Sequence, residues 1–102
     1  MEEVKVLGVE AEVLKIELSG DIDLSNAEGF YGEVTAAYAA TPANLLFDCE
    51  GLNFIDSTTL GTFVKILKEV KSNGHTLRLS NLQPKIKKLF VICSLDKIMQ
   101  LD

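Results

Sequence analysis

Cysteine and histidine are scarce in this sequence. It contains two cysteines, Cys49 and Cys93, no CxxC pair, and a single histidine, His75. Two cysteines do not make a disulfide framework, and a lone histidine does not match the ligand spacing of a zinc site. Both cysteines lie in apolar stretches, which favours buried free thiols over metal ligands or a redox pair. We therefore expect neither a metal centre nor a cofactor.

Long apolar runs and an excess of positive charge are also missing. The longest apolar runs fall far short of the ~20 residues that a membrane-spanning helix needs. The N-terminus, Met1-Glu2-Glu3, is acidic, whereas a secretory signal begins with basic residues followed by an apolar run. A net charge of −5 disfavours nucleic acid, which binds to positively charged surfaces. These features predict a cytoplasmic protein without direct membrane insertion or direct nucleic-acid binding.

What the sequence does contain is enough apolar material for one folded domain. Apolar residues make up 47% of 102 residues, and no linker, repeat or low-complexity segment divides the chain. We therefore expect a single domain over residues 1–102, with a monomer as the default oligomeric state. The one basic cluster, Lys85, Lys87 and Lys88, is typical of a solvated helix face. An acidic domain with a small basic patch suits binding to another protein.

The spacing of apolar residues predicts an α/β fold with the order β-β-α-β-α-β-α-β. The expected elements are strands at 4–7, 13–18, 45–47 and 75–80, three main helices following residues 25, 56 and 83, and a short strand or tail at 98–101. The first two strands are close enough to form an antiparallel hairpin. Helices that alternate with strands imply parallel neighbours and right-handed crossovers, so the sheet should be mixed.

Local signals refine these elements. Gly20-Asp21-Ile22-Asp23 is expected to break the second strand, and residues 49–55 to form a loop pinned to the core by Leu52, Phe54 and Ile55. Leu45-Leu46-Phe47 is typical of a central strand or one covered on both faces. Ser25 and Glu28 fit the capping-box pattern at the start of the first helix. The third helix is expected to bury Ile86, Leu89, Phe90 and Cys93.

The most informative stretch runs from Phe54 to Gly61, between a strand and a helix. Asp56, Ser57 and Thr58 lie where that helix begins, and short side-chain oxygens there can accept hydrogen bonds from unpaired backbone N–H groups. Two interpretations of Ser57 remain open. It is either an ordinary helix cap or a hydroxyl displayed for modification, where a phosphate adds roughly −1.5 to −2 charges beside Asp56.

Loops should gather at the carboxyl ends of the parallel strands, where open sheets meet their ligands and partners. These loops are residues 21–23, 48–57 and 81–84. They carry four carboxylates, Asp21, Asp23, Asp48 and Asp56. Loop caps and a solvated rim explain such carboxylates better than a metal or acid–base site does. Catalysis by Ser57 would need a base, and His75 lies beyond a helix ~24 Å long at 1.5 Å per residue, so we expect no enzyme.

Three segments together resemble the STAS domains, and within them the anti-sigma factor antagonists of bacteria. They are Leu18-Ser19-Gly20-Asp21-Ile22-Asp23, then Phe54-Ile55-Asp56-Ser57-Thr58 with Leu60-Gly61, and Ser94-Leu95-Asp96-Lys97-Ile98. The likeness covers nearly the whole chain, in the family's order and spacing. The resemblance implies a STAS domain over residues 1–102 and a binding switch that controls transcription. In this switch the unphosphorylated antagonist binds an anti-sigma factor that is also a serine kinase, is released on phosphorylation, and is reset by a PP2C-type phosphatase.

The resemblance also implies which residues carry the switch. Ser57 matches the phosphorylated serine, Asp56 precedes it in the motif, and Asp23 matches a loop aspartate near the kinase contact. The expected partner-binding residues are Asp21, Asp23, Asp56, Ser57, Thr58 and Thr59. Many antagonists have glycine where this chain has Thr59, which adds bulk and another hydroxyl.

A second function of a different class stays open. The chain would then be a non-catalytic STAS docking subunit of a lipid transporter or a stressosome-like assembly, without phosphorylation. Nucleotide binding is reported within the wider family, but this sequence has no glycine-rich phosphate loop that would support it.

Overall fold

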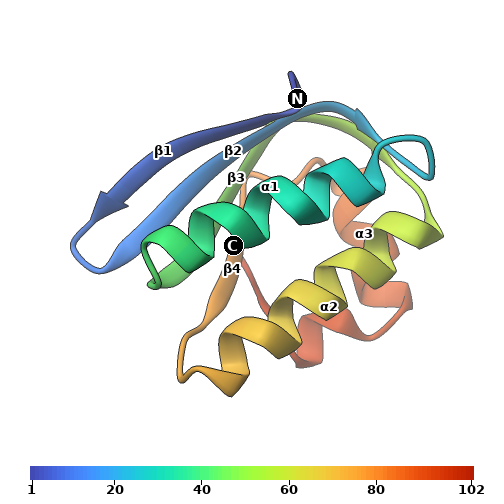
Figure 1. The fold of residues 1–102 in the computed structure, drawn as a ribbon. Coiled ribbons are helices and arrows are strands. Elements are labelled where there is room, and N and C mark those ends of the chain that lie inside the picture. The colour runs from blue at the N-terminus through green and yellow to red at the C-terminus, as the bar shows by residue number, and fades with distance from the viewer.

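The structure, a computed structural model that describes residues 1–102, is built on a mixed five-stranded sheet (Figure 1). Its strands lie side by side in chain order: β1 Val4–Glu10, β2 Val13–Ile22, β3 Asn44–Ile55, β4 Leu77–Ser80 and β5 Gln100–Leu101. β1 and β2 are antiparallel, and every other pair of neighbours is parallel. The predicted α/β class, element order and N-terminal hairpin are confirmed.

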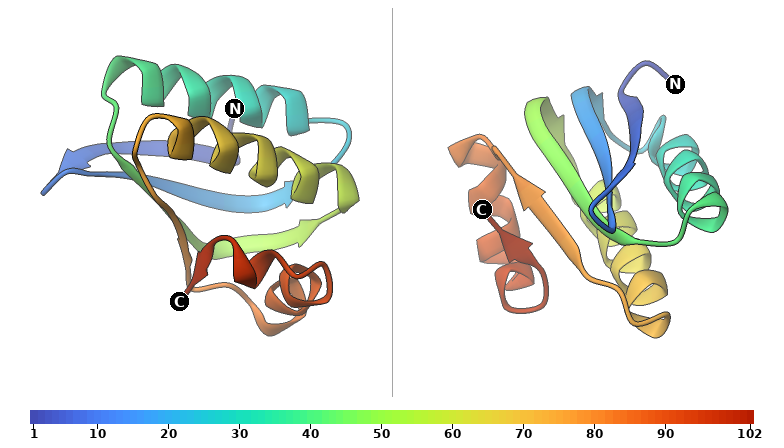
Figure 2. Two further views of the ribbon diagram at one scale, coloured as in Figure 1. Left: turned by 90° about the horizontal axis from the view of Figure 1, so that it is seen from below. Right: turned by 90° about the vertical axis from the view of Figure 1, so that its left-hand side faces the viewer.

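Three helices pack against this sheet: α1 Ala27–Ala40, α2 Ser57–Ser72 and α3 Pro84–Ile92. A short 3₁₀ turn, Leu95–Lys97, leads from α3 into β5. Figure 2 shows α1 and α2 side by side, with α3 apart from them near β4 and β5. None of these helices has the length and apolar character that crossing a membrane requires.

Four phenylalanines form the centre of the core. Phe30 of α1, Phe47 of β3, Phe63 of α2 and Phe90 of α3 are all fully buried. The ring of Phe63 lies 5.2 Å from that of Phe30, 5.5 Å from that of Phe47 and 5.4 Å from that of Phe90, each edge-on. Edge-to-face packing at these distances is favourable, so one aromatic cluster ties all three helices to the sheet.

β2 and β3 are longer than the sequence predicts. The expected break at residues 20–23 is wrong, because β2 continues to Ile22, and the expected loop at 49–55 is wrong, because it belongs to β3. The two strands stay paired to their ends, where Asp21 lies opposite Phe54 and Ile22 opposite Ile55. β3 is central, but its residues alternate between half-buried and buried as far as Cys49, and most of those beyond are exposed, so only one of its faces is fully covered.

Three other local predictions need correction. Ser25 does not cap α1, because the helix begins after Asn26 and Ser25 instead donates its hydroxyl to Asp23 Oδ1 at 2.5 Å. The predicted burial of Cys93 and Leu89 is also wrong. Cys93 is exposed beyond the end of α3, and Leu89 is 37% exposed, because α3 turns only Ile86 and Phe90 fully into the core.

The prediction for Cys49 is confirmed. This residue is buried, and burial raises the pKa of its thiol to about 12.

Candidate functional site

The candidate site begins with Asp56, the residue that caps α2. Its backbone is extended, and its Oδ1 atom accepts a hydrogen bond from the Thr59 N–H at 2.9 Å. Its Oδ2 atom accepts another from the Leu24 N–H at 2.8 Å. These bonds lower the pKa of Asp56 below its ordinary value of 3.8, because they favour the ionised form, and the bond from the Thr59 N–H has the largest effect. A fixed negative charge therefore stands at the start of α2.

The bond to Leu24 joins two loops that are distant in sequence. Leu24 belongs to the turn that connects β2 to α1, and this turn is held by its own side chains. Asn26 Oδ1 accepts from the Asp23 N–H at 2.8 Å, and Asn26 Nδ2 donates to the Asp21 carbonyl at 2.9 Å. Asp23 Oδ1 in turn accepts from the Ser25 N–H at 2.9 Å. The site is thus a small, hydrogen-bonded platform rather than a free loop.

Ser57 and Thr58 are the hydroxyl residues that this platform presents. Both are exposed, and Ser57 is the first residue of α2. Because Asp56 supplies the cap, the Ser57 side chain is not needed for that purpose. Of the two interpretations of Ser57, the capping one is therefore wrong, and the hydroxyl is open to solvent at the positive end of a helix.

Thr59 lies behind the surface. Its side chain is fully buried, and its hydroxyl donates to the Ile22 carbonyl at 2.6 Å while lying 3.0 Å from Asp56 Oδ1. In this conformation Thr59 holds the end of β2 against the start of α2, and it presents no hydroxyl to a partner. A buried threonine here explains how the chain accommodates the bulk of a side chain at this position.

The structure brings some of the predicted site residues together and separates others. Asp23, Asp56, Ser57 and Thr58 share the platform, and the exposed Asp21 lies at its edge, opposite Phe54. The third predicted loop does not join them. β4 ends at Ser80, opposite Asp48, whereas β3 continues well beyond that point.

Asp48 therefore belongs to a different cluster. Asn81 Nδ2 donates to Asp48 Oδ1 at 3.1 Å, which lowers the pKa of Asp48, and Gln83 bonds Asn53 further along β3. No group of three or more His, Cys, Asp or Glu side chains is placed to hold a metal ion. Asp23, Asp48 and Asp56 accept turn or cap hydrogen bonds from backbone N–H groups, whereas the Asp21 side chain is exposed at the edge of the platform.

Two apolar residues beside the platform were missed. Leu24 is 75% exposed within the β2–α1 turn, and Phe54, expected in the core, is 50% exposed at the end of β3. An isolated leucine in a polar turn was the available signal for Leu24. Nothing in the local sequence distinguishes Phe54 from Ile55, which is buried, because the face of a residue depends on the strand register.

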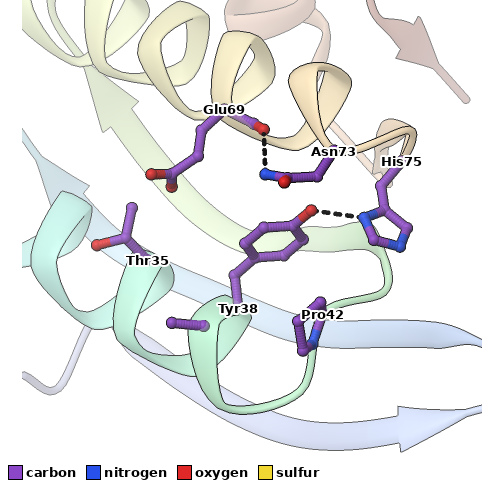
Figure 3. A pocket seen from close by; sticks show the side chains of 7 residues that line it. Thr35, Tyr38, Pro42, Glu69, Asn73 and His75 are labelled. Carbon is purple, nitrogen blue, oxygen red and sulfur yellow. Dashed lines mark hydrogen bonds between the residues drawn. The ribbon is translucent and has the colours of Figure 1, made fainter.

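The only histidine takes part in a separate pocket at the other end of α2 (Figure 3). This hollow, about 380 Å³ in volume, lies between the C-terminal parts of α1 and α2. The Tyr38 hydroxyl lies 2.5 Å from His75 Nδ1, and burial raises the pKa of Tyr38. His75 follows α2 in the chain and Ser57 begins it, so a helix ~24 Å long separates the imidazole from the serine.

Comparisons with known proteins agree on one family. A model of the STAS domain matches residues 5–102. The anti-sigma-B factor antagonist of Bacillus subtilis (strain 168) is 32% identical over 89 residues, which are 87% of this chain and 81% of that protein.

Two solved structures share the fold. An anti-sigma factor antagonist from Mycobacterium paratuberculosis superposes with a TM-score of 0.82 at 20% identity, covering 96% of this chain and 84% of that one. The Bacillus cell fate determinant SpoIIAA, in its phosphorylated form, gives a TM-score of 0.74 at 22% identity, covering 97% of this chain and 90% of that one.

Proposed function

Because this chain belongs to the STAS domain family, we propose that it is an anti-sigma factor antagonist that acts by binding and is switched at Ser57. In this proposal the unphosphorylated protein binds an anti-sigma factor with serine kinase activity, which releases a sigma factor for transcription. Phosphorylation of Ser57 dissociates the complex, and a PP2C-type phosphatase restores the binding form. The protein is a regulator and not an enzyme.

One observation carries the proposal: Ser57 is exposed on a platform whose own hydrogen bonds do not need it. A kinase can reach such a hydroxyl without unfolding the helix. The platform is also held in place by Asp56 and Thr59, so a partner meets a preformed surface. A preformed surface loses less conformational entropy on binding than a mobile loop does.

The neighbours of Ser57 explain how phosphorylation would act. Asp56 is a fixed carboxylate next to Ser57 in the chain. Leu24, whose N–H bonds Asp56, offers exposed apolar area on the platform, and Phe54 adds more at the adjoining end of β3. A phosphate would add roughly −1.5 to −2 charges to this surface. A partner that fits the neutral hydroxyl and the apolar side chains would then have to desolvate a dianion close to a carboxylate, which disfavours the complex.

The test is intact-mass analysis after incubation with ATP and each candidate anti-sigma kinase of the same organism. We expect a gain of one phosphate that is lost in Ser57→Ala and kept in the matched neighbour Thr58→Ala. Binding to the same kinase should be lost in Ser57→Asp.

Other outcomes would contradict this assignment. A phosphate that persists in Ser57→Ala would move the site to another hydroxyl. If no kinase modifies or binds the protein, the docking-subunit function takes its place. Co-purification with a transporter ATPase, without modification of Ser57, would support that alternative.

A further inference from the structure

The outer strand β1 is an unpaired edge with an unusual exposed surface. It pairs only with β2, so the backbone N–H and C=O groups on its other side have no strand partner. Six of its seven residues are exposed, and three of these are large and apolar: Val6 at 45%, Leu7 at 45% and Val9 at 44%. Sheet edges of this kind pair readily with another strand unless something blocks them.

A β-bulge arranges these side chains in a particular way. The register between β1 and β2 shifts between Val6 and Gly8, and Gly8 has a φ of +98° that glycine adopts without strain. Residues three apart in a regular strand point to opposite faces, but the shift brings Val6 and Val9 to the same face. Their partners on β2, Ile16 and Leu14, are both fully buried, which identifies this face as the one that packs against the core.

Two charged residues of β1, Lys5 and Glu10, also lie on either side of the bulge, but on the other face of the strand. Lys5 lies opposite Glu17 and Glu10 opposite Val13, so both charged side chains point away from the core face. Neither takes part in an ion pair. The segment thus reads Lys-Val-x-x-Val-Glu, with valines matched about the bulge and charges of opposite sign at its two ends.

We infer that β1 is a self-association surface on which a second copy of this chain pairs antiparallel, about a twofold axis through the bulge. That axis places Val6 opposite Val9 of the partner subunit on the core face. It places Lys5 opposite Glu10 of the partner subunit on the other face, and each pair occurs twice. Apolar and opposite-charge pairs directly across an antiparallel ladder are both favourable. Because β1 is the outer strand of the sheet (Figure 2), pairing would make the five-stranded sheet of each copy half of a continuous ten-stranded one.

The dimer should be weak, because a single edge strand buries less than the roughly 1,200 Å² of a standard interface. This inference does not depend on the proposed function of Ser57. A dimer would replace the monomer that the sequence analysis expects as the default oligomeric state, and it requires no partner other than a second copy of the protein.

Sedimentation equilibrium of the purified chain, up to about 1 mM, tests it. We expect concentration-dependent dimerisation in the wild type. Lys5→Glu and Glu10→Lys each place two pairs of like charges across the interface. Each should raise the dissociation constant of the dimer about tenfold. An equimolar mixture of these two variants should regain wild-type association, because every charge then meets its opposite. The double variant Lys5→Glu/Glu10→Lys should regain it alone.

The control is Lys71→Glu, at an exposed position of α2, which changes the net charge by the same amount as Lys5→Glu. It should leave the dimer unchanged, and circular dichroism should show that all variants remain folded. A wild type that stays monomeric throughout overturns the inference. So does association that the single variants leave intact, or that the mixture and the double variant fail to restore.

Discussion

Thr59 is the residue on which the platform around Ser57 depends most. It is fully buried, and its hydroxyl lies between the Ile22 carbonyl and the Asp56 carboxylate. The family resemblance places this position among the expected partner-binding residues. In this chain the side chain fills the space between β2 and α2, so its contribution is to stability and to the placing of Asp56.

We expect Thr59→Val to lower the free energy of unfolding by about 1–3 kcal/mol. Valine has nearly the same shape but leaves the Ile22 carbonyl without its hydrogen-bond donor in a buried position. The measurement is urea unfolding at neutral pH. The neighbouring exposed Thr58→Val serves as the matched control and should change the stability by less than about 0.5 kcal/mol. Equal stabilities for the two variants would contradict the bonding described for Thr59.

At this scale the sequence locates the helix start but does not identify the cap. Asp56, Ser57 and Thr58 all have side chains able to cap a helix. Which one does so depends on the backbone conformation at Asp56, and that conformation is fixed by the end of β3 and by the bond from Leu24. Contacts between residues 32 apart in sequence are not visible in a local pattern.

At the scale of elements, α3 shows where periodicity stops being informative. Its last four residues, Leu89 to Ile92, are all apolar, so several faces of the helix fit an apolar stripe equally well. The structure selects Phe90, which packs against Phe63 of α2. Leu89, Val91 and Ile92 are left 37%, 47% and 67% exposed. The presence of the helix is predictable from the sequence, but its rotation about its own axis is not.

Truncating each side of α3 tests this rotation. We expect Phe90→Ala to cost about 3–5 kcal/mol of stability, because it removes a fully buried ring and leaves a cavity in the aromatic cluster. Ile92→Ala should cost less than about 0.5 kcal/mol, since its side chain is mostly in solvent. Both are measured by chemical unfolding. A large loss for Ile92→Ala, or a small one for Phe90→Ala, would show that α3 is rotated.

The same scale explains the strand boundaries. Glycine and aspartate have low strand propensity, which is why residues 20–23 are predicted to break β2. Pairing along β3 outweighs that preference as far as Ile22. The element order, by contrast, follows from alternation and helical spacing alone, and these were sufficient to predict the mixed sheet.

At the scale of the whole molecule, the proposed switch requires that fold stability and partner binding be separable. The Ser57 residue is exposed, whereas α2 is held in place by its buried residues, among them Phe63 of the aromatic cluster. A negative charge at the first position of a helix is favoured by the helix dipole, by about 0.3–1 kcal/mol at an exposed site. Its repulsion by Asp56 acts in the opposite direction.

These two effects are of similar size, so Ser57→Asp should change the free energy of unfolding by less than about 1 kcal/mol. Binding to the kinase, in contrast, should be lost, because the added charge lies on the proposed contact surface. Urea unfolding and a binding titration on the same preparation separate the two readouts. If Ser57→Asp unfolds the protein, loss of binding by this variant says nothing about charge, and the phosphorylated wild type must replace it. If the variant is stable and still binds, phosphorylation of Ser57 cannot act through charge on this surface.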